Sequence, residues 1–129
     1  MSEFVLKLLK AEGLIHMAAA TNEQINDAEQ KLGVSFFEEY REYLYTFGVA
    51  SFYGHELTGI CASPRLNVID VTLAERHIFP KIPKSWYVVE EANIDGIVIW
   101  QSDSGEVFQA SPGVEPVRLG GSLVEYLEL

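Results

Sequence analysis

Apolar residues in the first half of the chain recur at helical spacing. Residues 2–12 place four apolar side chains on one side and stop at Gly13, which predicts a short amphipathic helix. Two longer helices are predicted at Thr21–Gly33 and Ser35–Gly48, because each begins with a Thr or Ser followed three residues later by Gln or Glu and ends at a glycine. They should form an angled helical pair. Residues 14–20 fit an extended or a helical conformation equally well.

The spacing changes after about residue 51. Residues 51–60 are aromatic and rich in glycine, which predicts short strands around a turn at Gly54. Residues 66–71 are apolar and β-branched enough to predict another strand. The sequence from Thr72 to Glu75 then fits a third capping pattern, opening a short helix that Pro80 closes.

The last third predicts a meander. Three consecutive antiparallel strands are expected at 86–91, 96–101 and 106–110. Residues 97–100 are apolar at every position, so their strand should be central and covered on both faces. An edge strand at 117–119 and a helix from Ser122 should follow.

Helices, then a meander, then a helix indicate an α+β fold with a mainly antiparallel or mixed sheet. A length of 129 residues with 48% hydrophobic residues suits one packed core. We therefore predict a single domain over 1–129, in which 1–20 is an N-terminal extension helix and 21–129 is the core.

The charge balance is strongly acidic. Nineteen Asp and Glu face nine Lys and Arg, for a net charge of −10. Nucleic acids and anionic membranes call for a basic surface, so neither is expected as a partner. A basic protein partner fits better, although acidity can also serve solubility alone.

The negative charge is concentrated in the predicted meander. No Lys or Arg occurs between Lys84 and Arg118, whereas six acidic residues do: Glu90, Glu91, Asp95, Asp103, Glu106 and Glu115. The sheet region should therefore present an acidic surface with aromatic residues that can anchor a partner. Tyr87, Trp100 and Phe108 are candidates for partial exposure, although burial is favoured for Trp100 because its strand is central.

Chemistry-bearing residues do not form a recognisable catalytic pattern. The lone cysteine, Cys61, has apolar neighbours and no nearby cation, which predicts a small buried residue. The three histidines are scattered, and no metal site is expected. A hydrolase that uses Cys61 or a carboxylate pair remains the enzymatic alternative.

The candidate carboxylate pairs have structural explanations. Glu38 should complete the cap with Ser35, and Glu39 should lie on the exposed side of the same helix. Glu90 and Glu91 are adjacent on a strand, so they should point to opposite faces. We predict no catalytic residues, no cofactor and no enzymatic activity.

Targeting signals are also missing. The N-terminus lacks the basic and apolar regions of a signal peptide, and no apolar run approaches the ~20 residues that span a bilayer. The expected location is cytoplasmic.

An ordered series of segments resembles the SUKH superfamily, which includes the yeast cell-wall assembly regulator and many bacterial immunity proteins of polymorphic toxin systems. The resemblance covers nearly all of 20–128, and its segments lie at 21–33, 38–48, 51–60, 67–72, 94–100, 105–108 and 122–127. One departure is Phe36-Phe37, where the family usually has Leu-Pro.

The resemblance implies an α+β fold without enzymatic activity. It also implies an antidote that binds and neutralises a cognate toxin, often a nuclease, whose basic active site an acidic face could cover. The alternative is a regulatory or scaffold module with several endogenous partners. Oligomeric state stays open. The predicted partner contacts are Tyr53, Glu56, Glu90, Asp95, Asp103 and Glu106.

Overall fold

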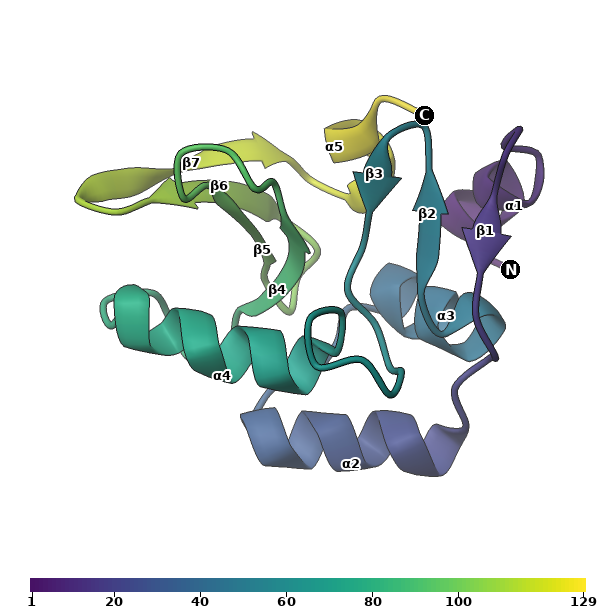
Figure 1. Ribbon diagram of the computed structural model, residues 1–129, viewed down its shortest axis with the longest axis horizontal. Helices are drawn as coiled ribbons and strands as arrows, with labels where there is room; N and C mark the ends of the chain where they lie inside the picture. Colours follow the sequence, from purple (N-terminus) through teal and green to yellow (C-terminus); the bar gives the residue numbers. More distant parts are fainter.

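Two antiparallel sheets and five helices make up the fold in the computed structural model, which describes residues 1–129 (Figure 1). The smaller sheet has the order β1 (Ile15–His16), β2 (Ala50–Phe52), β3 (His55–Glu56). The larger has the order β4 (Tyr87–Glu91), β5 (Val98–Gln101), β6 (Val107–Ser111), β7 (Val114–Gly120). An isolated antiparallel bridge between Leu57 and Glu90 connects the two sheets. The α+β prediction, with an antiparallel meander, is confirmed.

The N-terminal residues form part of the core. Helix α1 (Glu3–Leu9) buries Phe4, Val5 and Leu8 against α3 (Glu38–Phe47), and β1 pairs with β2. Residues 14–20 are thus extended around a two-residue strand rather than helical.

Helix α2 (Asn22–Leu32) begins as predicted. The Thr21 hydroxyl accepts a hydrogen bond from the Gln24 backbone N–H at 3.1 Å, and the Gln24 side chain accepts one from the Thr21 N–H at 2.9 Å. Gly33 ends the helix with φ of 68°, a left-handed conformation that favours glycine.

The predicted cap at Ser35 is wrong. Helix α3 begins two residues later than that cap implies, with Phe37 at its N-cap and no side-chain cap. The chain is held extended there because the Phe36 N–H donates to Glu29 at 2.8 Å and the Phe37 N–H donates to the Tyr87 hydroxyl at 3.0 Å. The predicted apolar stripe of α3 is buried, as expected.

The predicted strand at 66–71 is also wrong, because helix α4 (Val68–Ile78) occupies most of it. Asn67 caps this helix by accepting from the Ile69 N–H at 2.9 Å. Thr72 lies inside the helix, where its hydroxyl accepts from the Val88 N–H at 3.0 Å instead of acting as a cap. Helix α4 ends just before Pro80, as predicted.

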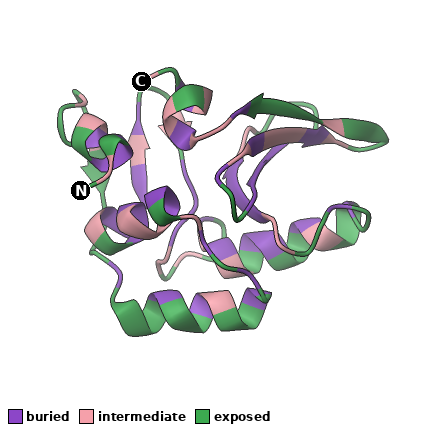
Figure 2. Cartoon of the chain, turned by 180° about the vertical axis from the view of Figure 1, so that it is seen from behind, coloured by how far each residue is buried: buried purple, intermediate pink, exposed green.

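The larger sheet is packed on both faces. Helix α4 covers one face through a cluster of seven buried residues, and a cluster of 23 buried residues fills the other side. Every residue of β5 is buried, which confirms its central position, and Figure 2 shows exposed residues instead along the outer β6–β7 hairpin. Trp100 is fully buried, as favoured, and Phe108 is partly exposed; the suggested exposure of Tyr87 is wrong, since it too is fully buried.

The C-terminal segment follows the prediction with one extension. Strand β7 starts at Val114, directly after the turn, and is longer than the predicted edge strand. Ser122 caps helix α5 (Leu123–Leu127) by accepting from the Glu125 N–H at 3.1 Å. None of the five helices has the length and apolar composition that crossing a membrane requires.

Candidate functional site

The β2–β3 hairpin ends in an exposed tyrosine. Tyr53 and Gly54 occupy its two-residue turn with φ of 46° and 80°, the left-handed pair of a type I′ turn. That first position favours Asn, Asp or Gly, and a bulky side chain there is strained. Tyr53 is nevertheless 62% exposed. The turn therefore presents a large aromatic ring to solvent at a conformational cost.

A buried carboxylate holds this hairpin in place. Glu90 on β4 accepts from the Tyr126 hydroxyl at 2.6 Å, from the Glu56 N–H at 3.2 Å and from His55 Nδ1 at 3.1 Å. One side chain thus joins β3, β4 and α5, which lie next to one another in Figure 1. Glu90 is only 6% exposed, because these three donors hold its carboxylate in the interior, so it does not lie on the surface where a contact was expected, and its role in binding stays a prediction.

The same contacts orient the His55 ring. An ionised carboxylate can only accept, so Nδ1 of His55 carries the hydrogen and Nε2 remains as an acceptor in the neutral ring. Burial, reinforced by the hydrogen bond to Glu90, raises the pKa of Tyr126, which keeps that phenol protonated as a donor. His55 thus stands beside Tyr53 in a defined orientation, partly open to solvent.

Glu56 lies on the same hairpin and is exposed. Arg65 donates two hydrogen bonds to its carboxylate, at 2.6 and 3.1 Å, and this arginine lowers the pKa of Glu56. Glu56 is therefore accessible, but its charge is matched within the chain.

The other three predicted contacts lie elsewhere. Asp95 is in the β4–β5 turn and Asp103 in the β5–β6 turn, at opposite ends of β5, and both are exposed. Glu106 pairs with Arg118 at 2.9 Å. The single acidic sheet surface expected between Lys84 and Arg118 is therefore divided. Tyr53 and Glu56 are brought together, and the partner roles of Asp95, Asp103 and Glu106 stay predictions.

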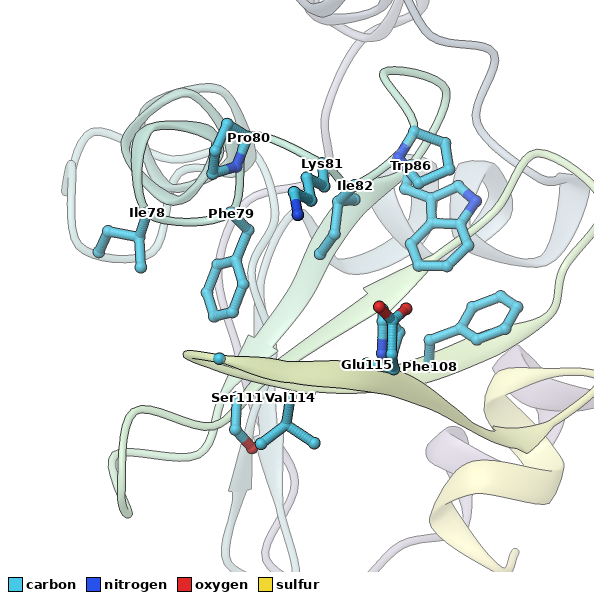
Figure 3. Close-up of a pocket in the computed structure, with 13 residues that line it drawn as sticks. Ile78, Phe79, Pro80, Lys81, Ile82, Trp86, Phe108, Ser111, Val114 and Glu115 are labelled. Carbon is cyan, nitrogen blue, oxygen red and sulfur yellow. The ribbon is translucent and has the colours of Figure 1, made fainter.

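A groove that the sequence did not predict lies at the far side of the larger sheet. It has a volume of about 570 Å³ and runs between residues 78–86 and the β6–β7 hairpin (Figure 3). The rings of Trp86 and Phe108 stack in it at a centroid distance of 4.1 Å and an angle of 11°. The only signal in the sequence was the pair of prolines, Pro80 and Pro83, before an aromatic strand.

A pair of carboxyl groups links α4 to β4. Glu75 is buried on α4 and hydrogen-bonds to Glu91 at the end of β4. Burial, with the adjoining Glu91 carboxyl, raises the pKa of Glu75 from 4.5 to about 8. Between those pH values the folded chain holds a proton that the unfolded chain has lost, so the stability that this proton confers falls as pH rises.

Glu75→Gln is expected to remove this pH dependence. At pH 8.5 the variant should be more stable than the parent by about 1–2 kcal/mol, a discounted figure because Glu91 remains half open to water. At pH 4 the two proteins should differ little, since Glu75 is then protonated in the folded chain and, like glutamine, carries no charge. Urea unfolding at the two pH values measures the difference. If the variant and the parent differed by the same unfolding free energy at both pH values, the raised pKa of Glu75 would be contradicted.

The lone cysteine takes no part in these two carboxylate clusters. Cys61 is half-buried rather than fully buried as predicted, because its Sγ is drawn to the Ser63 carbonyl at 3.5 Å near the surface. No three His, Cys, Asp or Glu side chains are grouped to hold a metal ion. The two surface features that could contact a partner are the β2–β3 hairpin with its exposed Tyr53 and the apolar groove beside Trp86.

A family model matches most of the chain. The SUKH_5 family model, described as SMI1-KNR4 cell-wall, matches residues 1–109. The matched span runs from α1 into β6, and it contains the β2–β3 hairpin, Glu90, Trp86 and Phe108. A search of curated proteins finds no match.

Proposed function

The chain belongs to the SUKH family described as SMI1-KNR4 cell-wall, and from this membership we propose that it is an immunity protein, which binds and neutralises a cognate toxin without catalysing a reaction. The family fits an immunity or SMI1/KNR4-like protein-interaction role and is generally non-catalytic. An immunity protein of this kind acts in the bacterial cytoplasm, where it meets the toxin.

One observation carries the proposal for the binding surface: the strained, exposed Tyr53 at the tip of the β2–β3 hairpin. Backbone strain of this kind costs on the order of 1–3 kcal/mol and clusters at functional sites. Tyrosine is enriched among the residues that dominate interface energies, because it combines a large contact area with a polar hydroxyl. The exposed ring, the oriented His55 and the accessible Glu56 form the proposed contact surface.

The charge of the chain indicates the partner's chemistry. A net charge of −10 favours association with a basic protein through long-range attraction. A nuclease toxin has a basic active site that an acidic protein can cover. The complex should therefore form more slowly as salt is added, since salt screens exposed charges.

Tyr53→Ala is expected to weaken the complex by roughly 30-fold, equivalent to about 2 kcal/mol for an interface anchor. The probe is the toxin domain encoded beside this chain's gene, with affinity measured by titration calorimetry and protection measured by growth on co-expression. Folding should be retained, because the side chain is 62% exposed and alanine leaves the turn length unchanged.

Tyr45→Ala is the matched control. Tyr45 is an exposed tyrosine at 55%, but it lies on α3 away from the hairpin turn. Its replacement should leave affinity and protection unchanged. Equal affinities for the two variants would show that the hairpin is the wrong surface. If the protein encoded beside this chain's gene is harmless when expressed alone, the proposal that it is a toxin is wrong.

A second candidate function rests on the family description itself, which refers to cell-wall proteins. In this role the chain would be a regulatory or scaffold module with several endogenous partners. Affinity purification of the tagged chain distinguishes the two: a single toxic partner supports immunity, whereas several non-toxic partners support the regulatory role.

A further inference from the structure

The groove beside Trp86 is separate from the hairpin surface and has features that select its occupant. Helix α4 covers β4 and β5, whereas the β6–β7 hairpin extends beyond it (Figure 1). The groove lies between this extension and residues 78–86, the segment that leads from α4 to β4, and it is open to solvent. Ile78 and Val114 stand at its rim with 59% and 60% of their surfaces exposed.

The floor is an aromatic platform. Trp86 and Phe108 stack nearly parallel, at 11°, and both are partly exposed. Phe79 and Ile82 continue the apolar lining. A flat, partly exposed pair of rings suits a rigid apolar ligand, because such a ligand loses little conformational freedom when it packs on them.

The walls offer few hydrogen-bond donors. Pro80, Pro83 and Pro116 line the groove, and proline has no backbone N–H. Pro116 also lies where the pairing register of β6 and β7 shifts, between Gln109 and Ser111. This part of the free β7 edge therefore lacks the regular row of donors and acceptors that an added β-strand needs.

Two charged side chains complete the site. Lys81 and Glu115 project into the groove from opposite walls, as Figure 3 shows, and neither takes part in an ion pair. The lysine can donate to backbone carbonyl groups of a ligand, and the glutamate can accept from a basic side chain. The site thus suits an apolar ligand that is basic at one end and whose few buried carbonyl groups can accept from Lys81.

We propose that this groove binds a proline-rich segment of a partner protein, in the extended polyproline II conformation, with a Lys or Arg next to it that pairs with Glu115. Polyproline II has no internal hydrogen bonds and its carbonyl groups stay hydrated, so its proline rings can pack on the platform while water supplies most of the donors. Aromatic-lined grooves are a recurrent docking site for such segments. The proposal goes beyond toxin binding and does not depend on it.

The test uses synthetic peptides and the whole chain. The probe is a ten-residue polyproline peptide with a C-terminal arginine; the comparison peptides are a glycine–serine peptide and an alternating valine–threonine peptide, both with the same arginine. Trp86 reports binding by fluorescence, since the second tryptophan, Trp100, is fully buried and contributes a constant background. The polyproline peptide should bind roughly tenfold more tightly than either comparison peptide.

Charge reversal identifies the site. Glu115→Lys should weaken the arginine-ended polyproline peptide by about fivefold and strengthen a glutamate-ended one, because a single exposed charge pair is worth at most about 1 kcal/mol. Glu115 is exposed on an edge strand, so the variant should fold. Glu12→Lys, a reversal at an exposed position outside the groove lining, should change neither affinity.

Several outcomes would overturn the proposal. Equal binding of the glycine–serine peptide would show that the rings do not select proline, and tighter binding of the valine–threonine peptide would assign the groove to strand addition. No binding of the polyproline peptide at millimolar concentration, or no effect of Glu115→Lys, would leave the groove without this ligand. None of these results bears on Tyr53 or the toxin.

Discussion

Gly59→Ala is expected to destabilise the fold severely. A Cβ atom at this position would lie 1.8 Å from the Gly48 carbonyl oxygen, far inside van der Waals contact. That oxygen cannot move away, because it accepts a hydrogen bond from the Ile60 N–H at 3.0 Å, and Gly59 itself donates to the Leu66 carbonyl at 2.8 Å. Overpacking of well-packed sites costs about 1–3 kcal/mol or more, and a clash with backbone lies at the upper end of this range.

Soluble yield and a thermal melt followed by circular dichroism measure this effect. Gly121→Ala is the control, since a Cβ there would meet only the mobile ends of the Arg118 and Glu125 side chains, at 3.3 Å. That variant should express and melt like the parent. A Gly59→Ala protein that melts within a few degrees of the parent would show that the two backbone segments can separate.

Glu39→Ala is expected to destabilise the chain by about 3 kcal/mol or more. The Glu39 carboxylate accepts from the Leu123 N–H at 2.7 Å and from the Val124 N–H at 3.3 Å, and thus caps the start of α5 from a distant helix. It also accepts from Gln101 at 3.3 Å. Alanine would leave the buried Leu123 N–H without an acceptor, open the half-buried Val124 N–H and remove one of the two acceptors of the Gln101 amide, and each buried donor left unpaired costs about 1–3 kcal/mol.

Glu38→Ala is the matched control for this residue. Glu38 is the neighbouring glutamate on the same turn of α3 and is exposed, so its loss should change stability by less than about 0.5 kcal/mol. Urea unfolding at pH 7 compares the two variants. Burial raises the pKa of Glu39 although the α5 N–H groups oppose this, so the carboxylate is held at some cost even in the parent. Similar unfolding midpoints for the two variants would contradict the proposed cap.

The two glutamates illustrate where sequence patterns mislead. The pattern assigned the cap to Glu38 and the exposed side of the helix to Glu39, whereas the structure has the reverse: Glu38 is free and Glu39 is buried. Both predictions used only neighbours along the chain. The interaction that decides the matter joins residues 84 positions apart, Glu39 and Leu123.

In the candidate site, too, some positions followed from the sequence and others depended on contacts between distant segments. Tyr53 and Glu56 were predicted as partner contacts together with four other acidic residues, and the structure leaves both exposed. Glu90 was predicted alongside them, but His55 and Tyr126 bring it inside. Apart from Pro80 and Pro83 the groove had no signature in the sequence, because its platform pairs Trp86, just before β4, with Phe108 in β6.

The sequence by itself determined the features that depend on near neighbours. The cap of α2, the apolar stripe of α3 and the turn chemistry of the β4–β7 meander each involve residues a few positions apart, so spacing alone predicted them. The acidic composition likewise predicted a basic protein partner, and this stays a prediction.

Only the tertiary structure decided which side chains are free to meet a partner. The apolar run at 66–71 suits a strand or a helix, and packing against β4 selected α4. Burial of Glu39, Glu75 and Glu90 likewise depends on donors or carboxyl groups that the fold brings from distant segments. A side chain's accessibility is a property of everything packed around it, and spacing along one chain segment does not contain that information.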